Sequence, residues 1–113
     1  MSKTIAENRT IPSVLVVDDE DSVLYTIEAV LKKQHYRIQK ASSAEEAIKK
    51  FKNDYFDLVI TDLTMSGASG IDLLEQVLAI NSDTLVILIT AYGSETLAVE
   101  AMKKGAYDYL PKP

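Results

Sequence analysis

Four apolar runs in this chain end in polar side chains that could do chemistry together. These side chains belong to Asp18, Asp19, Asp62, Thr90 and Lys112. Three carboxylates that meet within a few ångströms repel one another by about 1 to 4 kcal/mol per pair, at effective dielectric constants of about 80 to 20. A divalent cation would relieve this repulsion, and carboxylate oxygens with room for water favour Mg²⁺. Calcium is disfavoured, because the residue spacing of an EF-hand loop is missing.

Asp62 is the best candidate for a nucleophile in this set. A carboxylate beside a divalent cation and an ammonium group can attack phosphorus and form an aspartyl phosphate. Asp62 is followed by a small, glycine-containing loop that would let a phosphodonor approach, whereas the adjacent Asp18 and Asp19 cannot both point inward equally. Lys112 would neutralise charge on the transferred oxygens, and Thr90 would donate a hydrogen bond to them.

Each of these residues also has an ordinary structural explanation. Acids such as Asp18 suit the first turn of a helix, where they face the positive end of the helix dipole. Asp62 suits a turn, Thr90 is a β-branched strand residue, and Lys112 is explained as a solvated charge. His35 has no second histidine or cysteine as a partner, so we interpret it as a surface residue near a helix end. The chemical interpretation therefore depends on whether the ends of the runs meet.

The pattern of apolar residues places all these ends at one edge of a sheet. Short apolar runs alternate with amphipathic stretches, and the runs start mostly about 22 residues apart, as a strand, a helix and two loops require. We expect strands at 14–17, 36–41, 58–62, 85–90 and 107–110, and helices at 22–33, from 43, from 71 and from 94. This alternation predicts an α/β fold with a parallel sheet and helices on both faces. The carboxyl ends of such strands open on one side, where ligands bind.

Individual residues give finer expectations about these elements. The fourth run is the longest, so it should be a central strand buried on both faces. The second run is the most polar, so it should lie at an edge of the sheet. Ser43 and Glu46 form a capping-box pattern, and Ser94 should cap the last helix. Gly105 fits the left-handed position that follows a helix.

Composition indicates one ordinary globular domain behind a polar, flexible tail at residues 1–12. Of the 113 residues, 47% are hydrophobic and 26% are charged. The net charge of -5 and the lack of a Lys/Arg-rich stripe argue against direct binding of nucleic acid. The absence of cysteine excludes disulfides and thiolate metal sites. No run has the length of a signal peptide or a membrane span, so we expect a cytoplasmic protein without membrane contact.

Four segments resemble the receiver domain of two-component response regulators. The segments are Val16-Val17-Asp18-Asp19-Glu20, Ile60-Thr61-Asp62-Leu63-Thr64-Met65, Ile89-Thr90-Ala91 and Gly105-Ala106-Tyr107-Asp108-Tyr109-Leu110-Pro111-Lys112-Pro113. The resemblance covers residues 13–113 and is specific in order and spacing. It implies a flavodoxin-like three-layer sandwich with five parallel strands in the order 2-1-3-4-5. It also implies a cis peptide bond between Lys112 and Pro113.

The resemblance implies a role for each polar residue. Asp62 would accept a phosphoryl group from a sensor histidine kinase, and Thr90 and Lys112 would contact that group. The domain would be a signalling module rather than an enzyme, although it could catalyse its own phosphorylation from small donors and its own dephosphorylation. The ligands of Mg²⁺ would come from Asp18, Asp19, Asp62 and the backbone carbonyl of Thr64.

Tyr109 would be the aromatic switch of this family. Phosphorylation adds roughly -1.5 to -2 of charge, so Thr90 would move toward the phosphoryl group and Tyr109 would turn into the vacated space. The surface of the fourth helix and fifth strand would then report the change to a downstream output such as transcription. The residue types alone explain Tyr109 equally well as an aromatic side chain that packs on the fourth helix.

Two features depart from the family pattern. Ser66 stands where the family usually has proline, so we expect a more mobile loop after Asp62. The chain also stops where the family's fifth helix would begin, which predicts a C-terminally truncated receiver domain from a longer protein. An apolar sheet face would then be partly uncovered, and we expect self-association, such as a homodimer, through the face beside the first helix.

Three other functions fit parts of the same pattern. A haloacid-dehalogenase-like phosphatase also uses an aspartate nucleophile and Mg²⁺, but it normally has a second acid where Thr64 stands. A flavin or nucleotide binder would use Ser66 to Gly70 as a phosphate loop, but the glycine spacing of such loops is missing. A receiver-like interaction module that is never phosphorylated would have no use for the complete set of acids, threonine and lysine.

Overall fold

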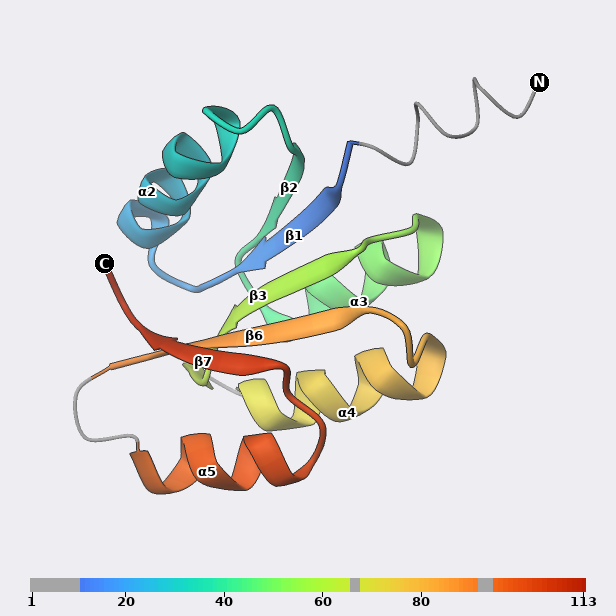
Figure 1. Cartoon of the computed structure of the whole chain (residues 1–113), viewed down its shortest axis with the longest axis vertical. Coiled ribbons are helices and arrows are strands. Elements are labelled where there is room, and N and C mark those ends of the chain that lie inside the picture. Colours follow the sequence, from blue (N-terminus) through green and yellow to red (C-terminus); the bar gives the residue numbers. More distant parts are fainter. Residues whose placement is uncertain (1–10, 66–67, 92–94) are drawn as a thin grey trace.

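The computed structural model describes residues 11–65, 68–91 and 95–113. It shows a central sheet with helices on both sides (Figure 1). The predictions about most of the N-terminal tail, about the loop at Ser66 and about a cap at Ser94 lie outside these residues. None of the helices in the three described segments is long and apolar enough to cross a membrane.

Five parallel strands form the sheet in the order β2-β1-β3-β6-β7. Counted within the sheet, this is the predicted order 2-1-3-4-5, with the polar second strand at one edge. A separate two-stranded ribbon follows the third strand. The strands are β1 (Ser13–Val17), β2 (Arg37–Ala41), β3 (Leu58–Asp62), β6 (Leu85–Thr90) and β7 (Asp108–Pro111), and the ribbon is β4 (Thr64–Met65) with β5 (Ala68–Ser69).

The last strand runs one residue further than expected. Pro111 was expected to stop it, but Pro111 pairs with Thr90 and the backbone N–H of Lys112 donates to the carbonyl of Thr90 at 3.0 Å. Proline is tolerated because β7 is an edge strand. The prediction of a cis peptide bond before Pro113 is wrong, because this bond is trans. Trans is the isomer that X–Pro bonds favour by about 0.5 to 1 kcal/mol.

Of the helices in the described residues, three pack on one face of the sheet and one on the other, and the two layers can be followed in Figure 1. The three on the shared face are α3 (Ala44–Asn53), α4 (Gly70–Ile80) and α5 (Glu95–Lys103), and the single helix is α2 (Asp21–Lys32). Gly105 follows α5 with a φ of 110°, as predicted for a left-handed helix end. His35 follows α2, also with positive φ, at 61°, and is exposed at the surface.

The start of α3 follows the predicted capping pattern with one difference. The Ser43 hydroxyl accepts the N–H of Glu46 at 3.1 Å. The Glu46 carboxylate accepts the N–H of Ser42 at 2.7 Å, whereas an ideal capping box would use the N–H of Ser43. Side chains therefore accept two backbone N–H groups at this helix start.

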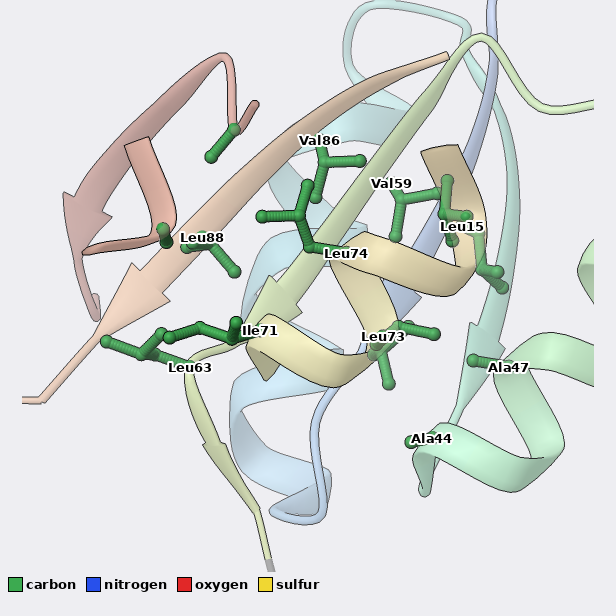
Figure 2. Packing of buried hydrophobic residues seen from close by; sticks show 14 of the residues in the cluster. Leu15, Ala44, Ala47, Val59, Leu63, Ile71, Leu73, Leu74, Val86 and Leu88 are labelled. Carbon is green, nitrogen blue, oxygen red and sulfur yellow. The ribbon is translucent and has the colours of Figure 1, made fainter. Parts of the chain in front are cut away.

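The main core lies between the sheet and the three-helix face (Figure 2). Alternate residues of the inner strands point into it, as the two-residue period of a strand requires. Truncating such a side chain to alanine typically costs about 2 to 5 kcal/mol, so this core fixes the sheet that carries the strand ends. Its largest fully buried members include Leu15, Val59, Val86 and Leu88 from the strands and Leu73 and Leu74 from α4.

The opposite face of the sheet is only partly covered. In the described residues α2 alone packs here, against Val14 and Val16. The prediction that the fourth strand is buried on both faces is therefore wrong, because Leu85 is exposed and Ile87 only half-buried. An apolar groove of about 250 Å³ runs between α2 and the last two strands. The groove agrees with the expected uncovered face, and self-association through it stays a prediction. Its lining includes Ile27, Val30, Ile60, Ile87, Ile89 and Leu110.

Candidate functional site

The parallel sheet brings four of the predicted side chains to one edge. Asp18 follows β1, Asp62 ends β3, Thr90 ends β6 and Lys112 follows β7, and the strand arrows all point toward this edge (Figure 1). The β3 ladder continues past Asp62, since the next residue, Leu63, donates its N–H to the carbonyl of Ile89 at 2.9 Å. Asp62 is therefore held by a central strand rather than by a free loop.

The Lys112 ammonium contacts three carboxylates at this edge. Its Nζ lies 3.1 Å from Asp62 Oδ2, 3.2 Å from Asp18 Oδ2 and 2.9 Å from Glu20 Oε1. Burial by itself would lower the pKa of Lys112, but its bonds to Glu20, Asp62 and Asp18 outweigh that effect and raise the pKa above its ordinary value. Lys112 is therefore a fixed positive charge beside the Asp62 carboxylate.

Asp18 is a buried carboxylate with unused bonding capacity. It is fully buried, and its Oδ1 accepts the N–H of Glu20 at 2.8 Å. Its Oδ2 has no hydrogen-bond partner among the described residues, although the Lys112 ammonium is within ion-pair distance. Burial raises the pKa of Asp18, and the nearby charge of Asp62 adds to this, while the hydrogen bond from the Glu20 N–H and the positive charge of Lys112 oppose the increase. An additional cation would stabilise its charged form.

The Asp62 carboxylate is nearly buried and is oriented by the backbone. Its side chain is 4% exposed, and its Oδ1 accepts the N–H of Thr64 at 3.2 Å. Gly70 packs directly against the Asp62 carbonyl and leaves no room for a β-carbon. The start of α4 therefore lies directly against the Asp62 backbone, and the Oδ2 of Asp62 faces Lys112.

Carboxylate oxygens on the β1–α2 turn lie close enough to share a metal ion. One oxygen each from Asp18, Asp19 and Glu20 lies within 4.8 Å of the others. Asp18 is buried and Asp19 is exposed, so the two neighbours do not point the same way, as expected. Hard oxygen donors, a buried carboxylate oxygen without a hydrogen-bond partner among the described residues and an exposed side for water fit Mg²⁺.

Thr90 and Tyr109 lie on the same face of the sheet, because Tyr109 pairs with Leu88, two residues before Thr90. The Thr90 hydroxyl donates to the carbonyl of Leu110 at 3.4 Å, a long bond. Thr90 also lines a hollow together with Lys112. Tyr109 is half-buried and packs against the main core cluster. Thr90 thus belongs to the edge with Lys112, whereas the predicted switch of Tyr109 stays a prediction.

Glu20 is the site residue that the sequence did not single out. It stands next to the predicted metal-binding pair and within one of the four quoted segments, but only the fold brings it to Lys112, 92 positions away. The signal available in the sequence was a third acid in the same turn, and a run of acids is ordinary at a helix start.

The family model of the response regulator receiver domain matches residues 14–113. The chain belongs to this family. Receiver domains are signalling domains whose general function is phosphoryl transfer, and they generally bind Mg²⁺. In this receiver domain Asp18, Asp62 and Lys112 lie together at the carboxyl edge of the sheet.

Relatives and solved structures agree with this assignment. The transcriptional regulatory protein ZraR of Escherichia coli K12 is 40% identical over 100 residues, which are 88% of this chain and 23% of ZraR. A receiver domain protein from Clostridium thermocellum superposes with a TM-score of 0.86 at 36% identity, covering 91% of this chain and 83% of that one. The beryllofluoride-activated NtrC4 receiver domain dimer gives a TM-score of 0.83 at 39% identity, covering 89% and 84%. The chain thus spans less than a quarter of ZraR.

Proposed function

We propose that Asp62 accepts a phosphoryl group from the phosphohistidine of a sensor kinase. The observation that carries this proposal is the ion pair of 3.1 Å between Asp62 Oδ2 and Lys112 Nζ at the carboxyl edge of the sheet. The same ammonium lies 3.2 Å from the buried Asp18. A nucleophilic oxygen, a fixed positive charge and a further acid therefore surround one point where a phosphoryl group could be received.

The transfer is an in-line displacement on phosphorus. An oxygen of Asp62 forms the new bond while the bond from phosphorus to the kinase imidazole nitrogen breaks, and its electron pair returns to the imidazole. Lys112 neutralises charge on the transferred oxygens. The Thr90 hydroxyl, held only by a 3.4 Å bond to a carbonyl, can exchange that partner for a phosphoryl oxygen.

Mg²⁺ would be held at the same edge and would supply further charge neutralisation. Its ligands would be carboxylates of the β1–α2 turn and of Asp62, together with one backbone carbonyl. The buried Oδ2 of Asp18, which accepts no hydrogen bond from the described residues, supports this assignment. The proposed ligands are Asp18, Asp19, Asp62 and the carbonyl of Thr64.

The response would be read on the surface formed by α5 and β7. Movement of Thr90 toward the phosphoryl group would allow Tyr109 to turn, and a coupling of about 1 to 3 kcal/mol would be enough for the switch. This surface already exposes apolar side chains at Val99, Met102 and Tyr107. Because relatives such as ZraR carry the name of transcriptional regulators, we propose that residues 13–113 form the receiver part of a longer protein with a transcriptional output.

Labelling with acetyl phosphate and Mg²⁺ tests the phosphoacceptor. Intact-mass and peptide analysis should show one phosphoryl group on Asp62, and none in Asp62→Asn. Asp83→Asn is the matched control, because Asp83 is exposed in the α4–β6 turn, away from the carboxyl edge, so it should label like the parent. Undiminished labelling of Asp62→Asn would contradict the proposal.

The same sample separates a phosphoacceptor from a phosphatase. A receiver domain should take up about one phosphoryl group and lose it slowly to water, whereas a haloacid-dehalogenase-like enzyme would turn over many equivalents of a phosphate ester. Thr64, where such an enzyme has its second acid, carries no charge and is exposed. We therefore expect self-dephosphorylation without ester turnover.

A further inference from the structure

The turn between β1 and α2 gives Lys112 a carboxylate that the proposed transfer does not use. Glu20 Oε1 accepts from Lys112 Nζ at 2.9 Å, the shortest of the three carboxylate contacts of this ammonium. The Glu20 side chain is 60% exposed, whereas those of Asp18 and Asp62 are 0% and 4% exposed. The three partners of Lys112 therefore differ sharply in how easily water can replace the ammonium.

Glu20 is also the N-cap residue of α2, but its side chain makes no capping bond. Its backbone carbonyl accepts the N–H groups of Val23 and Leu24 at 3.1 and 3.2 Å. The carboxylate points instead to Lys112, so this one ion pair connects the start of α2 with the end of β7. The helix start thus lacks the side-chain cap found at α3 and α4.

A lysine ammonium has three donors, and three carboxylates surround it here. Phosphorylation would convert the Asp62 carboxylate into an uncharged acyl ester and bring charged phosphoryl oxygens to Lys112, where they would compete with its two remaining carboxylate partners. Releasing the buried Asp18 would leave a charge without solvent, which is costly. Releasing Glu20 would cost little, because water can solvate its exposed carboxylate.

We propose that Glu20 is a positioning residue that holds Lys112 in the unphosphorylated domain and yields it to the phosphoryl group. The inference rests on the proposed phosphorylation of Asp62. Glu20 then opposes phosphorylation slightly, and its release removes the direct side-chain contact between the N-cap residue of α2 and Lys112, while Asp18 keeps its own contact with Lys112. Phosphorylation would in this way change contacts on the α2 side of the domain as well as on the α5 side.

Binding of beryllofluoride, an anion that mimics a phosphoryl group on a carboxylate, tests the competition. We expect Glu20→Gln to bind beryllofluoride about two- to fivefold more tightly than the parent at saturating Mg²⁺, by isothermal titration calorimetry, the range typical of a partly exposed ion pair. Asp21→Asn is the matched control, since it removes the same charge one residue further on. It should change the affinity less than Glu20→Gln.

A second measurement follows the Lys112 side chain directly by NMR spectroscopy. In the metal-free protein, the NMR signals of the Lys112 side chain should shift in Glu20→Gln but stay in place in Asp21→Asn. In the parent, they should move on addition of beryllofluoride and Mg²⁺ in the same direction as Glu20→Gln moves them. Glu20→Asp, whose shorter side chain keeps the charge but retracts it, should give a smaller shift of the same sign.

Two results would overturn the inference. One is an unchanged Lys112 signal in metal-free Glu20→Gln, which would mean that the ion pair is not formed in solution. The other is equal or weaker binding of beryllofluoride by Glu20→Gln than by Asp21→Asn. A parent protein that binds no beryllofluoride at all would instead contradict the phosphoacceptor proposal, so the two failures are distinguishable.

Discussion

Gly70 packs against the backbone carbonyl of Asp62 so closely that a β-carbon at Gly70 would overlap the carbonyl oxygen. The Gly70 N–H also donates to the carbonyl of Leu63 at 2.8 Å, which closes the turn that contains the β4–β5 ribbon. The first residue of α4 thus lies directly beside the proposed phosphoacceptor. Any larger residue here must move either the helix or the aspartate.

Substituting Gly70 by alanine should therefore reduce both stability and phosphorylation. We expect a loss of roughly 1 to 3 kcal/mol in the free energy of unfolding, the usual cost of forcing extra atoms into a packed site, measured by urea denaturation. The rate of labelling of Asp62 by acetyl phosphate should fall as well, because the carboxylate would be displaced from Lys112.

Gly105→Ala is the matched control for this substitution. It is also destabilising, because Gly105 has a φ of 110° and an added β-carbon would meet the end of the Leu78 side chain. Gly105 follows α5 and lies far along the chain from Asp62, so the labelling rate of the folded variant should stay unchanged. Equal loss of labelling in both variants would show that Gly70 acts only through global stability.

Replacing Thr90 by alanine should separate phosphorylation from the switch. The bond from the Thr90 hydroxyl to the carbonyl of Leu110 is long, at 3.4 Å, so its loss should cost less than about 1 kcal/mol of stability. Asp62 should still become labelled. The ring signals of Tyr109 in NMR spectra should respond to beryllofluoride in the parent and in Thr90→Ser, but not in Thr90→Ala. A full response in Thr90→Ala would remove Thr90 from the switch.

Mg²⁺ should stabilise the domain through the acidic edge of the sheet. At ten times its dissociation constant, a ligand that binds only the folded state adds about 1.4 kcal/mol, which thermal unfolding can detect and EDTA should reverse. Asp18→Asn should lose this response, since it removes the charge of the buried proposed ligand. The exposed Asp83→Asn should keep it, and a full response in Asp18→Asn would place the ion elsewhere.

The stability contribution of Glu46 should depend on pH. The hydrogen bond that the Glu46 carboxylate accepts from the N–H of Ser42 is the main cause that holds the pKa of Glu46 below its ordinary value. The charged carboxylate therefore stabilises the fold at pH values above the unfolded-state pKa of about 4.3. This contribution is lost as the pH falls through the lower, folded-state pKa. Glu46→Gln should therefore be less stable than the parent at pH 7, by about 0.5 kcal/mol, and the difference should shrink in acid.

The neighbouring Glu45 provides the comparison for this measurement. Its side chain is 86% exposed and lies 3.9 Å from Lys49, a contact that contributes little. Urea denaturation of Glu45→Gln should show almost no difference from the parent at either pH. A constant deficit of Glu46→Gln from pH 7 down to pH 3 would mean that its charge plays no part in the cap.

The sequence predicted which residues meet at the carboxyl edge of the sheet, because this depends on the spacing and the order of the apolar runs. Apolar runs about 22 residues apart predict parallel strands, and parallel strands bring Asp18, Asp62, Thr90 and Lys112 to one side whatever their loops do. Adjacency in the chain likewise predicted that Asp18 and Asp19 would not both be buried. These are local or topological properties that residue types reveal.

The remaining features depend on packing between distant segments. The contact of Glu20 with Lys112 arises where the β1–α2 turn meets the end of β7, and no pattern within either segment indicates it. The exposure of Ile87 depends on which helices cover the sheet, although the run that contains it looks fully buried. The pairing of Pro111 with Thr90 depends on β7 being an edge strand.

The two backbone N–H groups that follow Asp62 differ in what protects them from exchange with deuterated water. That of Leu63 is bonded to Ile89 within the sheet ladder, so its exchange requires the sheet itself to open, whereas that of Thr64 is bonded to the Asp62 carboxylate. Adjacent amides therefore record two separate equilibria. One reports the integrity of the sheet, and the other reports whether the carboxylate still faces its own backbone.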